Sequence, residues 1–158
     1  MGFEIGNHTL NHKHVNRMTP DEFRDELAAI EQKCAENGID KPVSFAYPGY
    51  DTSAAALTVL RERGYKFARA GLDRPYDPKT DSPLLIPSFT IKGSDEAAAI
   101  AMVAQARAER IVVLTLHGIP DYAHDWVSID PTLFEHLLEY LKREEYNVLA
   151  VRDLARYV

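Results

Sequence analysis

The chain has 158 residues, 46% of them hydrophobic, which is enough to bury one sizeable core in a single domain spanning residues 1–158. Its formal net charge is −6, from 24 acidic and 18 basic residues in short groups of mixed sign, so the sequence offers no basic stripe for nucleic acid. No apolar run reaches the length of a membrane span, and the first residues lack a signal-peptide pattern, so the compartment stays open. The only cysteine, Cys34, excludes an intramolecular disulfide and is interpreted as a small buried hydrophobe.

Apolar periodicity and turn residues divide the first half of the chain into alternating strands and helices. The clearest signal is at Thr19, where a cap, a first-turn proline and Glu22 form a capping box. A second helix is expected to be capped by Asp51 or Thr52 and to stop at Gly64. The elements predicted in this half are the end of a strand at 3–5, a helix at 19–37, a strand at 43–47, a helix at 51–63, a strand at 65–70 and a surface loop at 73–83.

The second half continues the same alternation. Residues 110–117 form the strongest predicted strand, whose continuous apolar run indicates burial on both faces, and this strand ends at His117. The other elements predicted in this half are a helix at 94–109, a helix that begins at Asp130 and Pro131, a strand at 147–151 and a short helix at 152–158. This order predicts an α/β fold with a mainly parallel sheet or barrel and with its chemistry at the carboxyl ends of the strands.

Histidines follow two of the predicted strand ends. His8 and His12 are four residues apart, so on a helical turn their imidazoles would share one face and could share a divalent cation. On spacing alone, solvated or capping histidines are an equally good interpretation, and His14 is expected to be exposed. Parallel strands would gather His8, Pro48 and His117 on one edge. A hydrogen-bonded histidine at a strand end is the alternative interpretation of His117.

Three segments resemble motifs of the polysaccharide deacetylase family, the nodulation-type glycan deacetylases. The segment EIGNHTLNH is similar to the family's histidine-x-x-x-histidine metal motif, FAYPGY to its proline-containing third motif, and LTLHGIP to its leucine-x-leucine-histidine motif. Their order and spacing agree with the family, and the resemblance runs over the whole chain. It implies an incomplete, distorted (β/α) barrel with mainly parallel strands, from which the first strands of the family domain are missing.

The resemblance implies a metal-dependent hydrolase of non-peptide C–N bonds that deacetylates an N-acetylated glycan or a related small molecule. His8 and His12 would bind a divalent metal, with zinc preferred and cobalt or nickel as alternatives, and His117 would protonate the leaving amine. The substrate-binding residues implied lie in the third motif, in the histidine motif and in a wall or lid that follows it: Tyr47, Pro48, Gly49, Tyr50, Leu116 and Trp126.

The sequence also departs from the family. The threonine-phenylalanine-aspartate-aspartate segment, which supplies the catalytic base and a third metal ligand in the family, has no counterpart here, and the fourth motif has no good copy. The chain therefore resembles roughly the last two-thirds to three-quarters of the domain. Ala46 and Gly49 stand where the third motif usually offers an arginine and a tyrosine. Asp51 or Asp121 could replace the missing aspartate, and an N–H near Gly49 or Tyr50 could face the oxyanion.

Three functions stay open on this basis. The leading hypothesis is the deacetylase, and its competitor is a non-catalytic remnant or carbohydrate-binding fold that keeps His8 and His12 but lacks the base. Family branches that act on small cyclic amides are a third hypothesis. The loops at 73–83 and 121–128 would set the substrate and carry no recognisable code. Because a barrel without its first strands exposes apolar edges, we expect self-association into a homo-oligomer.

Overall fold

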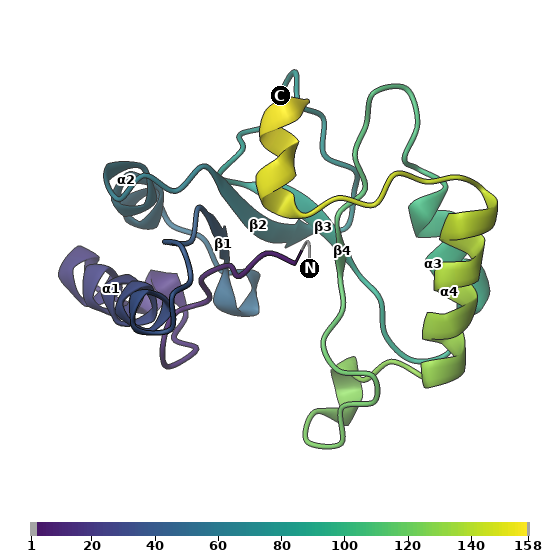
Figure 1. The fold of residues 1–158 in the computed structure, drawn as a ribbon, viewed down its shortest axis with the longest axis horizontal. Coiled ribbons are helices and arrows are strands. Elements are labelled where there is room, and N and C mark those ends of the chain that lie inside the picture. Colours follow the sequence, from purple (N-terminus) through teal and green to yellow (C-terminus); the bar gives the residue numbers. More distant parts are fainter. Residues whose placement is uncertain (1–2, 158) are drawn as a thin grey trace. The chain divides into compact units, whose positions relative to one another are not determined.

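The computed structural model describes residues 3–157, along which strands and helices alternate (Figure 1). The strands follow the order β1-β2-β3-β4 in the sheet. The strands and α-helices, in chain order, are α1 (Pro20–Glu36), β1 (Ser44–Ala46), α2 (Ala54–Glu62), β2 (Phe67–Leu72), β3 (Ile86–Thr90), α3 (Glu96–Val103), β4 (Leu114–Thr115) and α4 (Pro131–Arg143). Short 3-10 helices lie at Val15–Arg17, Pro48–Tyr50, Asp125–Val127 and Val151–Arg156. This pattern confirms the predicted α/β class, an incomplete distorted (β/α) barrel with mainly parallel strands.

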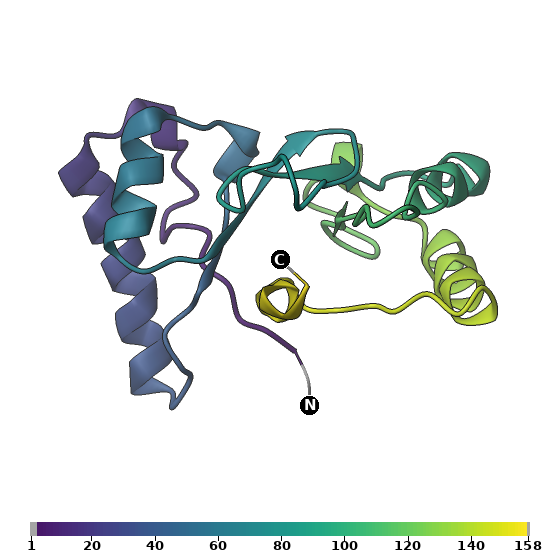
Figure 2. The same cartoon turned by 90° about the horizontal axis from the view of Figure 1, so that it is seen from above.

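Residues 3–157 divide into two compact units, which are described separately. Unit 1 contains residues 3–70, 81–86 and 150–157, and unit 2 contains residues 71–80 and 87–149. Figure 2 shows α1 beside α2 in unit 1 and α3 beside α4 in unit 2, and each of these helix pairs is in contact. The expected single domain over residues 1–158 stays a prediction. Among residues 3–157, no helix is both long enough and apolar enough to cross a membrane.

Unit 1 is built on the parallel pair β1 and β2, in which Ser44 lies opposite Phe67. The predicted capping box begins α1, because the Thr19 hydroxyl accepts the N–H of Glu22 while the Glu22 carboxylate accepts the N–H of Thr19. The N-cap of α2 is Ser53, and not Asp51 or Thr52 as expected. The buried core of this unit is Val15, Phe23, Leu27, Phe45, Tyr47, Ala56, Val59, Leu60, Tyr65, Ala68, Ala70 and Leu84.

Unit 2 contains the parallel pair β3 and β4 and the helices α3 and α4, which contact each other. The predicted cap of α4 is present, since the Asp130 carboxylate accepts the N–H groups of Thr132 and Leu133. Helix α3 ends at Val103, well before the predicted position 109, and Ala104 is its C-cap. A helix could not have reached 109, because Ala108 and Glu109 adopt left-handed φ angles of 53° and 66°. The buried core of this unit is Ile91, Ala99, Val103, Ile129, Leu133 and Leu137.

Two strands of unit 2 differ from the sequence expectation. Strand β3 was not predicted, since Pro87 interrupts the apolar run of this segment and cannot donate to a strand ladder. The predicted strand at 110–117 is reduced to β4, and residues 111–116 are half-buried rather than buried on both faces. The segment is half-buried because Leu114 and Leu116 pack only part of their side-chain surface against the core of unit 2.

The predicted strands near the two ends are absent. Residues 3–5 have no regular structure, and their segment joins the sheet only through an isolated parallel bridge between Asn7 and Phe45. Residues 147–150 also have none, because no strand of the described chain pairs with them and a strand needs a neighbour for its backbone groups. The short helix expected at 152–158 is the 3-10 helix Val151–Arg156, and Val158 lies outside the described residues.

Candidate functional site

The loop that carries His8 and His12 is attached to β1 through the backbone of Asn7. The Asn7 N–H donates to the Ser44 carbonyl at 2.9 Å, and the Ala46 N–H donates to the Asn7 carbonyl at 2.9 Å. These two bonds continue the sheet for one residue beyond β1 and β2. The histidines therefore follow directly from a fixed point of the sheet.

The Asn7 side chain holds the same loop from inside the core of unit 1. It is 1% exposed, and its amide donates to the Leu27 carbonyl at 3.1 Å and to the Tyr65 hydroxyl at 2.7 Å. Its side-chain oxygen accepts the N–H of Thr9 at 3.0 Å. A buried amide with three hydrogen bonds fixes one loop conformation, because any other conformation would leave polar groups unpaired.

His8 and His12 are brought together, but not by a helical turn. Their ring centroids lie 4.8 Å apart at an interplanar angle of 73°. The residues between them form a loop in which Thr9 and His12 have φ angles of 63° and 54°. His8 Nδ1 lies 2.7 Å from the Ala46 carbonyl, to which it donates in the matching tautomer. A histidine whose Nδ1 is held by a backbone carbonyl is common among metal-binding histidines.

Thr9 is the strained residue of this loop. A β-branched residue with a φ of 63° is unusual, and such backbone strain costs about 1–3 kcal/mol. Its Oγ1 is buried and has no hydrogen-bond partner among the described residues. Strain and an unsatisfied hydroxyl beside His8 are both typical of a binding loop, since the rest of the fold must stabilise such a conformation.

The middle of the loop is held by a carboxylate from α1. Glu26 is 7% exposed and accepts the Asn11 N–H at 2.8 Å and the Asn11 side-chain amide at 2.7 Å, with Lys13 Nζ at 3.6 Å. Burial alone would raise the pKa of Glu26, but the hydrogen bonds from Asn11 outweigh it and hold the pKa below its ordinary value. Glu26 thus stays ionised and positions the segment between the two histidines.

His14 is half-buried, and not exposed as expected. The loop reverses at His12 and brings the His14 ring onto the turn Pro48–Tyr50, where Gly49 has a φ of 59°. A Cβ on Gly49 would lie 2.3 Å from His14 Cε1, so only glycine permits this contact. His14 Nδ1 lies 2.7 Å from Asp51 Oδ2. Asp51, one candidate for the missing aspartate, is therefore already paired with a histidine of its own unit.

The third-motif residues form this turn. The Tyr47 side chain is fully buried and its hydroxyl donates to the Leu84 carbonyl at 3.1 Å, while burial raises its pKa. The Tyr50 N–H donates to the Tyr47 carbonyl, so this donor closes the turn rather than facing outward. Arg69 of β2 was not among the predicted residues, and its guanidinium carbon lies 5.0 Å from the centroid of the Tyr50 ring. The only sequence feature that could have indicated Arg69 is that it is a single basic residue inside an otherwise apolar strand. Substrate contacts of Tyr47, Pro48, Gly49 and Tyr50 stay predictions.

A second cluster of histidines surrounds Asp121 in unit 2. His117 follows β4, and its Nδ1 lies 2.6 Å from Asp121 Oδ2. His124 Nδ1 lies 3.2 Å from each oxygen of the same carboxylate, and the two imidazole centroids are 5.3 Å apart. Asp121 Oδ1 also accepts the N–H groups of Ala123 and His124, both at 3.0 Å. The loop therefore folds around one carboxylate.

His117, Asp121 and His124 form a candidate metal group, because one ligand atom from each lies within 4.8 Å of the others. The Asp121 side chain is 13% exposed, and the two histidine side chains are 47% and 49% exposed. Burial would raise the pKa of Asp121, but hydrogen bonds from His117 and then from His124 and Ala123 lower it below its ordinary value. Over residues 3–157, no comparable group of three forms around His8 and His12.

The remaining predicted residues of unit 2 lie near this cluster in sequence. Leu116 is half-buried against the core of unit 2. Trp126 is 66% exposed, and its ring centroid lies 5.3 Å from that of His124. Their roles as substrate-binding residues stay predictions. The expected common edge for His8 and Pro48 of unit 1 and His117 of unit 2 also stays a prediction.

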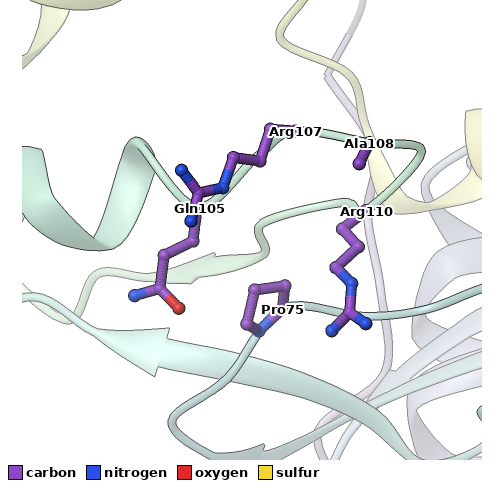
Figure 3. Close-up of a pocket in the computed structure, with 5 residues that line it drawn as sticks. All are labelled: Pro75, Gln105, Arg107, Ala108 and Arg110. Atoms are coloured by element: carbon purple, nitrogen blue, oxygen red, sulfur yellow. The ribbon is translucent and has the colours of Figure 1, made fainter.

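A small cavity of about 210 Å³ lies elsewhere in unit 2 (Figure 3). Its lining residues are Pro75, Gln105, Arg107, Ala108 and Arg110. Arg110 already contacts the Asp77 carboxylate, with Nη2 3.8 Å from Oδ2. None of the predicted catalytic, metal-binding or substrate-binding residues lines this cavity, and its one link to the prediction is Pro75, which belongs to the loop at 73–83 that is expected to set the substrate.

Comparison with known proteins confirms the family resemblance for the first part of the chain. Residues 1–68 match the family described as polysaccharide deacetylase. These residues contain the histidine loop and the third motif, which are the two motifs of unit 1. No curated protein sequence matches the chain.

One of two similar solved structures, a carbohydrate esterase, supports the fold. The family 4 carbohydrate esterase from Streptomyces lividans, in complex with acetate, matches with a TM-score of 0.53 and 18% identity over 90% of this chain and 62% of that protein. The Streptococcus pyogenes deacetylase PplD, in complex with acetate, has a TM-score of 0.48 and 17% identity over 52% of this chain and 36% of that one. The chain thus spans less than two-thirds of each of these two structures.

Proposed function

We propose that the chain belongs to a metal-dependent deacetylase that hydrolyses the acetamide bond of an N-acetylated glycan or a related small molecule. The observation that carries this proposal is the pair of imidazoles at His8 and His12, with His8 Nδ1 held by the Ala46 carbonyl. The pair lies in the segment that matches the deacetylase family. The S. lividans esterase supports the fold, and the reaction is argued from the site.

The donor set of unit 1 suits a divalent cation. His8 and His12 would hold it through imidazole nitrogens, and the orphaned Thr9 hydroxyl beside them adds a polar group to the same loop. When bound, such a cation acidifies a water molecule and polarises a carbonyl, which is the chemistry that amide hydrolysis needs. Because stable zinc sites normally take three or four protein ligands, we expect His8 and His12 alone to bind zinc weakly.

His117 is the proposed general acid. Asp121 accepts the Nδ1 proton of its imidazole, which fixes the tautomer and orients the ring. Nε2 is then the atom that would give a proton to the leaving amine. Asp121 in this arrangement is a positioning residue, and it serves His117 without contacting the substrate.

The missing component is a general base. Both carboxylates that could replace it are engaged, since Asp51 pairs with His14 and Asp121 with His117 and His124. General-base assistance is worth about two to four orders of magnitude in rate. We therefore expect this chain alone to release acetate from N-acetylated chito-oligosaccharides slowly or not at all.

A non-catalytic, carbohydrate-binding role is the second candidate. One observation favours it: in the described part of the chain, no third histidine, cysteine or carboxylate joins His8 and His12 in a ligand group. Such a protein would bind N-acetylated oligosaccharides without releasing acetate. It would also tolerate the loss of His117.

Acetate release with added zinc or cobalt, measured beside oligosaccharide binding, separates the two candidates. The deacetylase predicts slow, metal-dependent release that falls further in His117→Gln and in a His8→Ala/His12→Ala double variant, but not in His136→Gln, a control at an exposed histidine of α4. Binding without release, unchanged in His117→Gln, would favour the second candidate. Fast release that is lost in Asp51→Asn would instead identify the base within this chain.

A further inference from the structure

We propose that unit 2 contains a second, separate site for a divalent transition metal, formed by His117, Asp121 and His124. This site uses none of the residues assigned to the metal of unit 1. It does not rest on the proposed deacetylase function, because it is inferred from the geometry and chemistry of the three side chains. Two imidazoles and one carboxylate are a ligand set that zinc and cobalt accept, with a fourth position left for water.

The distances are close to those that a bound cation requires. With metal–ligand bonds of about 2.0–2.2 Å, two tetrahedral ligands lie about 3.4 Å apart. His124 Nδ1 is already 3.2 Å from both Asp121 oxygens, whereas His117 Nδ1 is 2.6 Å from Oδ2 and would have to withdraw slightly. Both imidazoles are about half-exposed, so rotation of the His117 ring needs no change in the core of unit 2.

The carboxylate is fixed in place before any ligand binds. Asp121 Oδ1 accepts the N–H groups of Ala123 and His124, and the Asp121 N–H donates to the Ser128 hydroxyl at 2.9 Å. Gly118 permits the close turn, because a Cβ at that position would lie 2.4 Å from the Asp121 Cβ. Pre-organised ligands lose little conformational entropy on binding, which favours a metal over a chance contact between exposed side chains.

A purely hydrogen-bonded cluster is the competing explanation. In that case Asp121 simply accepts protons from both histidines, as Glu96 accepts one from His136 on α4, where His136 Nδ1 lies 2.8 Å from Glu96 Oε2. The histidines of the two clusters are exposed to a similar degree, although the Glu96 side chain is 48% exposed and that of Asp121 only 13%. Within residues 3–157, no third ligand joins His136 and Glu96. This pair is therefore the matched control for a site that depends on three converging groups.

Metal bound at this site would change what His117 can do. An imidazole that donates its Nδ1 electron pair to a cation cannot take a second proton, so it cannot act as a general acid. The second site and the acid role are thus mutually exclusive states of one side chain. If the proposed deacetylase function holds, excess zinc should inhibit the enzyme. The existence of the metal site is tested separately, by measuring metal binding.

The chain provides a local reporter for the test. Trp126 is its only tryptophan, and the Trp126 ring lies edge-on to the His124 ring, with centroids 5.3 Å apart. Cobalt(II) bound by His124 would quench Trp126 fluorescence, and zinc, which does not quench, would restore it by displacement. We expect saturable quenching at one cobalt per chain in the wild type. Asp121→Asn and His117→Gln, which both leave His124 and Trp126 in place, should each weaken binding at least tenfold.

The remaining variants assign the signal to this site. Quenching should persist in a His8→Ala/His12→Ala double variant and in His136→Ala, with helix content checked by circular dichroism in every variant. The proposal is overturned if the wild type shows no saturable quenching, if Asp121→Asn and His117→Gln both bind cobalt as the wild type does, or if the His8→Ala/His12→Ala variant loses the signal. An equal loss in His136→Ala would also overturn it, because scattered surface histidines would then explain the binding.

Discussion

The two histidine clusters of this protein are held in place by different means. In unit 1, the loop with His8 and His12 is held by the buried Asn7 and Glu26, but within residues 3–157 no carboxylate joins the two histidines in a ligand group. In unit 2, His117 and His124 are half-exposed and converge on Asp121, which is itself held by the backbone of its own loop. The first cluster depends on the core, and the second depends on local contacts.

This difference predicts how the clusters respond to mutation. Changes to the supports of His8 and His12 should lower the stability of unit 1, because those supports are buried polar groups with several partners. Changes around Asp121 should alter ligand geometry with little effect on unfolding, because that loop contributes little to the core of unit 2.

The largest effect is expected for Asn7→Ala. The substitution removes three hydrogen bonds and leaves the Thr9 N–H, in a residue only 6% exposed, without its acceptor. We expect the free energy of unfolding to fall by about 2–3 kcal/mol in denaturant titrations. The control is Asn37→Ala, which removes one exposed bond to the Lys33 carbonyl and should cost under about 1 kcal/mol. Equal losses in the two variants would contradict the buried support of the histidine loop.

The second prediction concerns Gly49→Ala. A Cβ at this position would both strain a left-handed backbone and collide with the His14 ring. We expect a loss of about 2 kcal/mol in unfolding free energy, together with a shift of the His14 imidazole signals in the NMR spectrum. Gly38→Ala shares the positive φ but has open space around its Cβ, so it measures the backbone strain alone. If both variants lose the same stability, His14 does not pack on the turn.

The helices could be predicted well because their signals are local. The capping box at Thr19 and the cap at Asp130 each join residues at most three positions apart, so the sequence contains the whole interaction. Strands were harder, since a strand exists only if a neighbour takes its hydrogen bonds. That is why β3, interrupted by Pro87, was missed and residues 147–151 were wrongly expected to pair.

The candidate site was predictable in its residues but not in its geometry. The spacing of His8 and His12 predicted that their rings would meet, yet two left-handed residues, and not a helix, bring them together. The contacts of His14 with Gly49 and of His124 with Asp121 depend on the paths of loops. No local pattern encodes such a path, because it is set by hydrogen bonds and packing distant in sequence.

The third prediction compares Glu26→Gln with the wild type across pH. The folded-state pKa of Glu26 is lowered, so its contribution to stability is present above the unfolded-state pKa and is lost as the pH falls through the folded-state pKa. At neutral pH we expect the variant to be about 1–2 kcal/mol less stable, since Asn11 loses bonds to a charged acceptor.

The pH dependence supplies the check on this prediction. The difference in unfolding free energy between the wild type and Glu26→Gln should shrink as the solution is acidified. Asp25→Asn, at an exposed neighbour on α1, should stay within about 0.5 kcal/mol of the wild type at every pH. A difference that does not change with pH would show that Glu26 acts through packing and not through its charge.

The smallest effect is expected in unit 2, at His136 of α4, and it should have the opposite sign. The hydrogen bond to Glu96, followed by the charges of Glu96, Glu139 and Glu135, raises the pKa of His136. A raised pKa gives a contribution that is fully present below the unfolded-state pKa and is lost as the pH rises through the folded-state pKa. Acid should therefore strengthen the contact between α3 and α4 while it weakens the support of the histidine loop in unit 1.

An NMR titration of the His136 imidazole tests this last contrast. We expect the wild-type midpoint to lie above that of an unperturbed histidine and to fall in Glu96→Gln, because the substituted amide keeps the shape of the side chain but removes its charge. Glu139→Gln should lower the midpoint less, since Glu139 acts on the ring only through its charge. An equal midpoint in the wild type and Glu96→Gln would mean that the contact between His136 and Glu96 does not persist in solution. Unit 2 would then lose its predicted opposite response to pH.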